Sequence, residues 1–458
     1  KKAKSDLAGY EFEEKYDKNR EKAFINQLLT HKIKVYKKGD TYTVPLKQPQ
    51  HRMVQTMFET YNQYRDSVFY DASAWSVANF YNIKYKGVKS VKLGDEITTT
   101  KNMANPVEVA KAEYAYILNW DDYNTPAALY FLQSKGLKVA SAFKPFSINT
   151  SEGEKYFNYG SLLIPVSKQK FKSDAIFKII ATAQKKFNIP VFATNSGFSL
   201  KGIDLGSNNF RVLEKSRPAL LIGEGVNSYE AGEVWHLLDT RIHMPITKIR
   251  MTNFRRANLD KYNTLVMVSG SYRELDSVQI QKLKNWTAKG NTLITIAGAS
   301  KWTIDKKLVQ ENLTKRLKEK DKKEVKRMPY VDASENSGKE RIGGAIFEVQ
   351  LDVTHPLGFG YRYAELPVYK NNKVFLAPSK SAYATVAKYS ENPHIDGFVS
   401  KDNLENFIKP SASLLVSPIG SGRVVLFADN PNFRGAWYGT NKLFLNALFL
   451  GSEIRVPR

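Results

Sequence analysis

The 458-residue sequence contains no cysteine and only six histidines. The absence of cysteine excludes disulfide bonds, thiolate metal sites and cysteine nucleophiles. None of the histidines begins an H-x-x-E or H-E-x-x-H motif, so the usual paired zinc ligands are also missing. The sequence therefore predicts no catalytic residue, no metal site and no cofactor in this chain.

Long hydrophobic runs and an excess of acidic residues are absent too. No stretch approaches the roughly 18 apolar residues that a membrane-spanning helix needs. The first 22 residues are charged and lack both an initiator Met and an apolar signal core, so we interpret the chain as an internal piece of a longer or processed protein.

The formal net charge of +24 predicts attraction to polyanions such as an anionic cell-surface polymer. No nucleic-acid-binding motif accompanies it, so we expect no specific nucleic-acid partner.

Short apolar runs between Arg217 and Trp302 provide the clearest structural signal. The runs RPALLIGEG, YNTLVMVSG and NTLITIAG alternate with segments of helical period, such as Leu275 to Lys289. This alternation is typical of a parallel sheet wrapped by helices. The stretch from Tyr114 to Ser196 repeats the same order, strand-helix-strand-strand-helix-strand, as a weak internal repeat. We therefore predict an α/β protein with two successive Rossmann-like or flavodoxin-like doubly wound domains.

The domain boundaries follow from this pattern. Residues 1–22 are predicted to be a linker or peripheral segment, residues 23–212 the first α/β domain, and residues 213–458 the second. The second domain carries a long insertion at about 303–410, which includes a basic stretch from Thr314 to Arg327. An aromatic stretch from Tyr64 to Tyr85 is either domain core or a ligand-facing loop.

The carboxyl ends of the strands are where ligands bind in open α/β sheets. The turn after the first strand of the second domain, GEGVNSYE, departs from G-x-G-x-x-G because position 228 is Ser. We retain this turn as a candidate pocket for a small polar ligand or a peptide end. Its candidate residues are Gly223, Glu224, Gly225, Asn227, Ser228 and Glu230.

The turn after NTLITIAG is the place where a nucleophile elbow lies in hydrolases of related topology. The residues there, Ala297 to Lys301, do not form G-x-S-x-G. A closed, non-catalytic turn is the favoured interpretation. The alternative is a serine-dependent hydrolase that uses Ser300, with His236 or His243 as the base.

Several stretches together resemble a known family. They are YDASAWSVANFYNI, TPAALYFLQSKGLKV, YGSLLIPV, RPALLIGEGVNSYEAGEVWHLLDTR and the ending GRVVLFADNPNFRGAWYGTNKLFLNALFLG. They resemble the non-catalytic region C-terminal to the peptidase domain in large zinc carboxypeptidases of the Bacteroidetes type. The second domain is also similar to the class I glutamine amidotransferase-like fold, but it lacks the cysteine nucleophile.

The resemblance implies a function for the whole protein rather than for this chain. An upstream metallopeptidase domain would hold zinc, and the parent protein would be periplasmic, outer-membrane-associated or extracellular. This chain would be an accessory region that supports the peptidase domain or binds peptide substrate. The alternatives are an independent small-ligand-binding module and the serine-dependent hydrolase.

Overall fold

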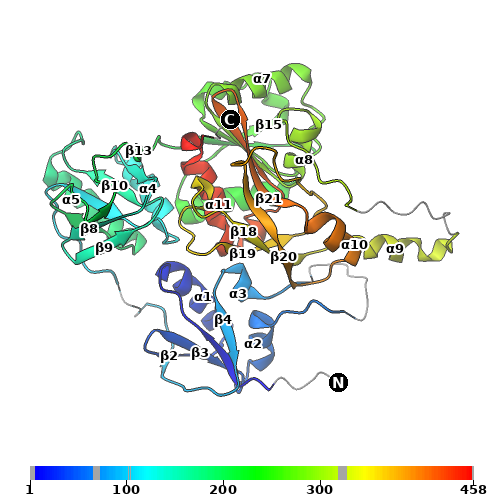
Figure 1. Ribbon diagram of the computed structural model, residues 1–458, viewed down its shortest axis with the longest axis horizontal. Coiled ribbons are helices and arrows are strands. Elements are labelled where there is room, and N and C mark those ends of the chain that lie inside the picture. The colour runs from blue at the N-terminus through cyan, green and yellow to red at the C-terminus, as the bar shows by residue number, and fades with distance from the viewer. Residues whose placement is uncertain (1–5, 65–72, 102, 104, 318–326, 456–458) are drawn as a thin grey trace.

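The computed structural model describes residues 6–64, 73–101, 103, 105–317 and 327–455. Arg65, Asp66, Tyr70 and Asp71, in the predicted aromatic stretch, lie outside this range, as do residues 318–326 of the basic stretch. Figure 1 shows three bodies, formed by the N-terminal residues, by a middle segment and by the C-terminal half of the chain. No helix within the described ranges is long and apolar enough to cross a membrane.

The N-terminal body is an antiparallel five-stranded sheet in the order β4-β1-β3-β2-β5. Its strands are β1 (Gly9–Phe12), β2 (Val35–Lys38), β3 (Thr41–Pro45), β4 (Tyr85–Val88) and β5 (Asp95–Ile97), and its helices are α1 (Lys18–Thr30), α2 (His51–Phe58) and α3 (Val77–Phe80).

Of the two interpretations of residues 1–22, a linker or a peripheral segment, the linker does not fit residues 9–22, because β1 pairs with β3 and β4 and α1 begins at Lys18. Tyr10 and Phe12 alternate with Gly9 and Glu11, and both rings are buried against Phe58. In the sequence, the surrounding charged residues conceal this short period-two pattern.

The middle body contains the predicted order of elements but not the predicted sheet. Its sheet has the order β11-β6-β10-β7-β13, and every neighbouring pair is antiparallel. The elements are β6 (Ala115–Leu118), α4 (Thr125–Ser134), β7 (Ala140–Ala142), β10 (Leu162–Pro165), α5 (Ser173–Phe187), β11 (Phe192–Thr194) and β13 (Phe210–Val212). A separate small sheet contains β8 (Phe146–Thr150), β9 (Gly153–Phe157) and β12 (Lys201–Gly202).

The first predicted domain is therefore not doubly wound. Strand β10 lies between β6 and β7 and runs against both, which is the split βαβ arrangement of ferredoxin-like folds. The sequence order strand-helix-strand-strand-helix-strand is common to this arrangement and to a doubly wound one. Apolar periodicity identifies the elements, but it does not determine which strands become neighbours.

The C-terminal body has the predicted parallel sheet. Strands β15, β14, β16, β17 and β22 are neighbours in that order and are parallel, which is the flavodoxin-like order 2-1-3-4-5. These strands are β14 (Pro218–Ile222), β15 (Thr247–Arg250), β16 (Thr264–Met267), β17 (Thr292–Ile296) and β22 (Gly422–Phe427). Helix α6 (Ser228–His236) lies between β14 and β15, α7 (Ser277–Ala288) lies between β16 and β17, and α8 (Gly298–Asp305) follows β17.

The segment between α8 and β22 extends the same sheet with antiparallel strands, in the order β22-β21-β20-β18-β19. The strands are β18 (Ala345–Leu351), β19 (Glu365–Lys370), β20 (Thr385–Asp396) and β21 (Ala412–Ile419), with helices α9 (Ala333–Lys339) and α10 (Lys401–Asn403). Strands β21 and β22 form a hairpin with its turn at residues 419–422. The segment predicted as an insertion thus continues the sheet.

Helix α11 (Tyr438–Phe449) lies at the centre of the molecule (Figure 1). Each of its residues from Gly439 to Phe449 is buried. Its apolar side chains belong to one continuous core with residues of α4, α5 and the parallel sheet. The middle and C-terminal bodies therefore share a core.

The short helical turn Pro356–Gly358, which contacts α11, gives a prediction about acid stability. His355 caps this turn, with Nδ1 accepting from the Leu357 amide at 3.1 Å, and burial lowers the pKa of His355 from 6.5 to about 4. The folded state keeps this ring neutral, so its contribution is present above pH 6.5 and is lost as the pH falls toward 4. His355→Asn retains a capping oxygen but has no ring to protonate. The free energy of unfolding should therefore fall less on acidification than in the wild type, by up to about 3 kcal/mol.

Urea unfolding at pH 4.5 and 7 measures the effect. His51 is exposed, so His51→Asn is the matched control and should leave the pH dependence unchanged. An identical acid loss in wild type and His355→Asn would contradict the assignment.

Candidate functional site

Three of the polar side chains in the largely apolar helix α11 contact the loop that follows β6. Lys442 is 4% exposed, and its Nζ donates to the carbonyl oxygens of Trp120 at 2.6 Å, of Asp122 at 3.0 Å and of Asp121. Asn446 Oδ1 accepts from the Trp120 indole at 2.7 Å, and Asn441 Oδ1 accepts from the Tyr123 hydroxyl at 2.8 Å. Buried polar groups need such partners. The helix therefore holds the loop that follows β6 in a fixed conformation.

The N-terminal body binds the same loop from its other side. Asp17 caps α1 by accepting from the Arg20 amide at 3.1 Å, and it also accepts from the Tyr123 amide at 2.9 Å. Asn19 donates to both carboxylate oxygens of Asp122, at 2.8 and 2.9 Å. Arg20 pairs with Glu14 at 2.6 Å. Three segments far apart in the sequence thus converge on residues 120–123.

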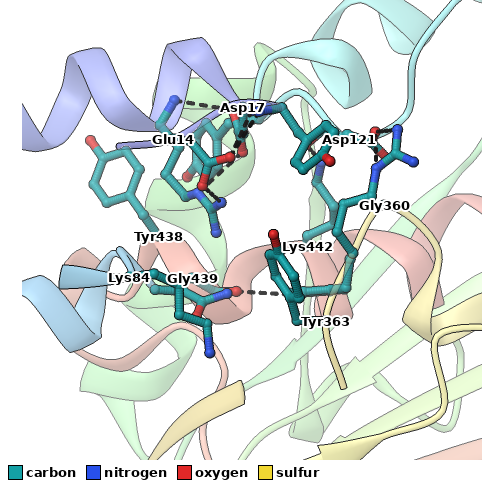
Figure 2. A pocket seen from close by; sticks show the side chains of 15 residues that line it. Glu14, Asp17, Lys84, Asp121, Gly360, Tyr363, Tyr438, Gly439 and Lys442 are labelled. Carbon is teal, nitrogen blue, oxygen red and sulfur yellow. Dashed lines mark hydrogen bonds and ion pairs between the residues drawn. The ribbon is translucent and has the colours of Figure 1, made fainter. Parts of the chain in front are cut away.

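A narrow hollow, the junction pocket, lies where these segments meet. Figure 2 shows the side chains that surround its open centre. About 40 Å³ of it admits groups the size of a water molecule. Its lining residues come from all three bodies: Glu14, Tyr16, Asp17, Arg20, Asn82, Lys84, Asp121, Tyr123, Gly360, Tyr361, Arg362, Tyr363, Tyr438, Gly439 and Lys442.

Asp121 is a carboxylate of this pocket with unused hydrogen-bonding capacity. It is 5% exposed, and its Oδ2 accepts from Arg362 Nε at 2.8 Å and from Nη2 of the same guanidinium. Its Oδ1 is buried and accepts no hydrogen bond from the described residues. An unsatisfied buried carboxylate oxygen is costly, so a ligand or water that donates to it would be favoured.

Burial shifts the pKa values of the charged groups at this junction. It raises the pKa of the Asp121 carboxyl, although Arg362 opposes the shift. It also raises the pKa of Asp122, with the nearby Asp17 adding to the effect. Burial lowers the pKa of Lys442, although the same three carboxylates oppose that shift. Each charged form is therefore disfavoured by burial, and it is stabilised by Arg362 for Asp121, by the Asn19 hydrogen bonds for Asp122, and by the carboxylates for Lys442.

Tyrosines form the outer rim of the pocket. Tyr16 is 44% exposed and Tyr363 is 54% exposed. The Arg362 guanidinium lies 4.5 Å from the centre of the Tyr16 ring, and Lys84 Nζ lies 5.7 Å from the centre of the Tyr363 ring. Exposed tyrosine and arginine side chains are enriched where proteins bind other chains.

The predicted turn after β14 lies at the carboxyl edge of the parallel sheet, but it is closed onto the loop after β16. Gly223 and Gly225 have positive φ, and the Ser271 amide donates to the Gly225 carbonyl at 2.9 Å. Asn227 caps α6, and Glu230 accepts from the Ser269 amide at 2.8 Å. Their polar groups thus hold the turn itself. Glu224 and Ser228 are exposed beside it.

The turn after β17 has the backbone of a nucleophile elbow without a nucleophile. Ala297 has φ 49° and ψ −111°, a conformation that residues with a side chain rarely adopt. Ser300 does not take this position, which corrects the serine-hydrolase alternative. It is 0% exposed, and its hydroxyl lies 3.0 and 2.8 Å from the carbonyl oxygens of Thr295 and Phe427. A hydroxyl so enclosed cannot reach a substrate.

Glu233, in α6, is a further carboxylate at this edge of the sheet. Its two oxygens accept from the Arg434 amide at 2.5 Å and from Asn430 Nδ2 at 2.6 Å, and burial raises its pKa from 4.5 to about 7. The contribution of Glu233 to stability is therefore full below pH 4.5 and falls as the pH rises through 7. In Glu233→Gln, the decrease in the free energy of unfolding between pH 5 and pH 8 should be smaller than in the wild type by up to about 3 kcal/mol.

Urea unfolding at four pH values across this window tests the prediction. Glu224→Gln, on the same edge but exposed, is the control and should keep the wild-type slope. A wild-type slope in Glu233→Gln would show that the carboxyl does not titrate in this range.

Within the described residues, no group of three or more His, Cys, Asp or Glu side chains is arranged to hold a metal ion.

Comparisons with known proteins give limited information. No protein-family model matches the chain, and no curated protein matches it. Among solved structures, it is similar to PurLQS from Thermotoga maritima, with a TM-score of 0.33, 13% identity and coverage of 51% of this chain and 97% of that one. It is also similar to a protein described as ThuA-like from Parabacteroides merdae, with a TM-score of 0.33, 13% identity and coverage of 53% and 92%.

A protein from Thermoplasma acidophilum, described as one of the subunits of GMP synthase, gives a TM-score of 0.31 at 10% identity, with coverage of 51% and 94%. These neighbours have glutamine amidotransferase-like or ThuA-like folds. Scores and identities this low transfer no activity to the chain. Its α/β architecture follows from the strand order of its own sheet.

Proposed function

We propose that this chain is a non-catalytic region that binds the amino end of a peptide in the junction pocket. The observation that carries the proposal is the buried Asp121 Oδ1, which accepts no hydrogen bond from the described residues in a pocket formed by three bodies. A terminal ammonium supplies the missing donor and is small enough for the narrow space. The remainder of the peptide would lie on the tyrosine rim.

The charges of the pocket are compatible with such a ligand. The three carboxylates that line it are Glu14, Asp17 and Asp121. Four cations line it as well: Arg20 pairs with Glu14, Arg362 pairs with Asp121, Lys442 donates to three carbonyl groups, and Lys84 lies at the rim over the exposed Tyr363 ring. The remaining acceptor is therefore negative, and it favours a donor over an anion.

Thermal unfolding of the full chain in the presence of small ligands tests this function. Tri-alanine should raise the melting temperature in a concentration-dependent way, because a ligand that binds only the folded state stabilises it. N-acetyl-tri-alanine lacks the ammonium and should give a smaller rise, and maltotriose none. A rise with maltotriose alone would support the alternative, an independent small-ligand-binding module, and contradict the peptide proposal.

The resemblance in sequence supports a proposal for the whole protein. We propose that this chain is an accessory region of an exported zinc metallocarboxypeptidase, periplasmic, outer-membrane-associated or extracellular, with the zinc in an upstream peptidase domain. That domain would be its main partner, and an anionic cell-surface polymer a second one. The full-length protein should cleave C-terminal residues from peptides in a zinc-dependent reaction, and residues 1–458 alone should not. Hydrolysis by this chain alone would overturn the accessory role.

A further inference from the structure

Arg423, at the start of β22, is a buried cation without a carboxylate partner. Its side chain is 5% exposed, and it lies at the amino end of the parallel strands, opposite the edge that holds Glu230. Among the described residues, the hydrogen-bond acceptors of its guanidinium include no carboxylate, and Glu453 acts on it only through a weaker electrostatic effect. Buried charges are normally paired, so this arrangement requires an explanation.

The hydrogen bonds of this guanidinium do not neutralise it. Nη1 donates to the Gly290 carbonyl at 3.0 Å and Nη2 to the Ser421 carbonyl at 2.7 Å. Nε is buried and has no acceptor within the described part of the chain. These acceptors, with the Thr292 hydroxyl 3.4 Å from Nη1, orient the guanidinium plane, and none of them carries a negative charge.

A hollow of about 560 Å³ adjoins this arginine. The exposed Arg455 supplies a second cation, and Ser421 and Ser452 supply hydroxyl groups. No acidic residue is among those that line it. The turn at Gly420 and Gly422 carries no side chains that would fill the space. A Cβ at Gly422 would lie 1.8 Å from the Thr287 carbonyl oxygen, so this close backbone approach requires glycine.

We propose that this hollow is a binding site for a phosphate group, with Arg423 and Arg455 as its cations and the serine hydroxyls as additional donors. Arginine is the side chain best suited to phosphate oxygens, because its planar N–H groups form charge-assisted hydrogen bonds. The volume exceeds that of inorganic phosphate, so a phosphate monoester suits the site better than the free ion. This site is separate from the junction pocket, and it does not depend on the proposed peptide function.

Calorimetric titration of the full chain with sodium phosphate and with glycerol 3-phosphate, at an ionic strength held constant with sodium chloride, tests the site. We expect saturable binding of both ligands, with the ester tighter. Arg423→Met should weaken phosphate binding by at least about tenfold, the equivalent of one lost charge-assisted hydrogen bond. Arg455→Gln changes an exposed residue and should weaken binding without affecting folding. Lys301→Gln, on the exposed face of α8, should leave binding unchanged.

Three outcomes would overturn the proposal. The first is that titration with either phosphate ligand gives no more heat than titration with sodium chloride. The second is an unchanged phosphate affinity in Arg423→Met. The third concerns the case in which Arg423→Met does not fold. An unchanged phosphate affinity in Arg455→Gln would then rule out the site. Tighter binding of glycerol 3-phosphate than of phosphate identifies the ligand as an ester, and equal binding identifies it as free phosphate.

Discussion

Lys442→Met should lower the free energy of unfolding by about 3 to 5 kcal/mol, as expected when one partner of a buried charge network is removed. The substitution removes the donor for the carbonyl oxygens of residues 120–122. It also leaves the carboxylates of Asp17, Asp121 and Asp122 without their central cation. Because these groups join α11 to the loop after β6 and to α1, the middle body should loosen first. Urea unfolding combined with amide hydrogen exchange of residues 115–123 measures both effects.

Lys301→Met is the matched control for this prediction. Lys301 pairs with Asp305 on an exposed face, where an ion pair contributes little, so the change should be within about 0.5 kcal/mol. An equally small effect of Lys442→Met would contradict the conclusion that this lysine fastens the three bodies together.

Asp429→Asn should destabilise the C-terminal body by a similar amount, about 3 to 5 kcal/mol. Asp429 follows β22, and its oxygens accept from Lys370 Nζ at 3.0 Å, from the Tyr389 hydroxyl at 2.7 Å and from the Ser413 hydroxyl at 2.6 Å. Lys370 is 0% exposed, so the variant leaves an uncompensated charge in the core. Urea unfolding followed by tryptophan fluorescence measures the loss.

A double-mutant cycle separates the ion pair from the packing around it. Lys370→Met removes the orphaned charge, so Asp429→Asn combined with Lys370→Met should be more stable than Asp429→Asn alone. This pair connects β19, in the segment predicted as an insertion, to the parallel part of the sheet. If the double variant were less stable than either single variant, the ion pair would not be the main contribution of these two residues to the free energy of unfolding.

The parallel sheet could be predicted from the sequence because its strands are continuous apolar runs. Such runs, separated by helical periods, indicate strands buried on both faces, which is typical of a parallel sheet. The hairpin at 419–422 was predictable from its glycine-rich turn. The antiparallel sheet of residues 115–212 was not, because the same sequence of elements is compatible with two ways of pairing the strands.

The junction pocket could not be found from local motifs. Its residues lie in five short segments, and none of these carries a recognisable pattern. One signal was available, since Asn441, Lys442 and Asn446 interrupt an apolar helix, and a helix that is apolar on all sides is a buried one. Polar side chains in such a helix need buried partners. The sequence does not identify those partners, because most of them lie more than 80 residues away.

The predicted turn at residues 223–230 was located correctly at the carboxyl edge of the sheet. Its side chains were expected to face a ligand, whereas Asn227 and Glu230 bind the backbone of the turn and of Ser269. Asn and Glu at these helix positions serve equally as caps and as ligand contacts, so their identities did not distinguish the two roles. The elbow at Ala297 was expected to be empty, and its side chain is a methyl group.

Calorimetric titration of tri-alanine into the wild-type chain and into Asp121→Asn tests the central claim most directly. The variant keeps an oxygen for Arg362 and replaces the free acceptor with an amide donor. If the ammonium donates to Asp121 Oδ1, the variant should bind about 10- to 100-fold more weakly, the range for a hydrogen bond to a charged group. Equal affinity in the two proteins, or no binding to the wild-type chain, would contradict the account.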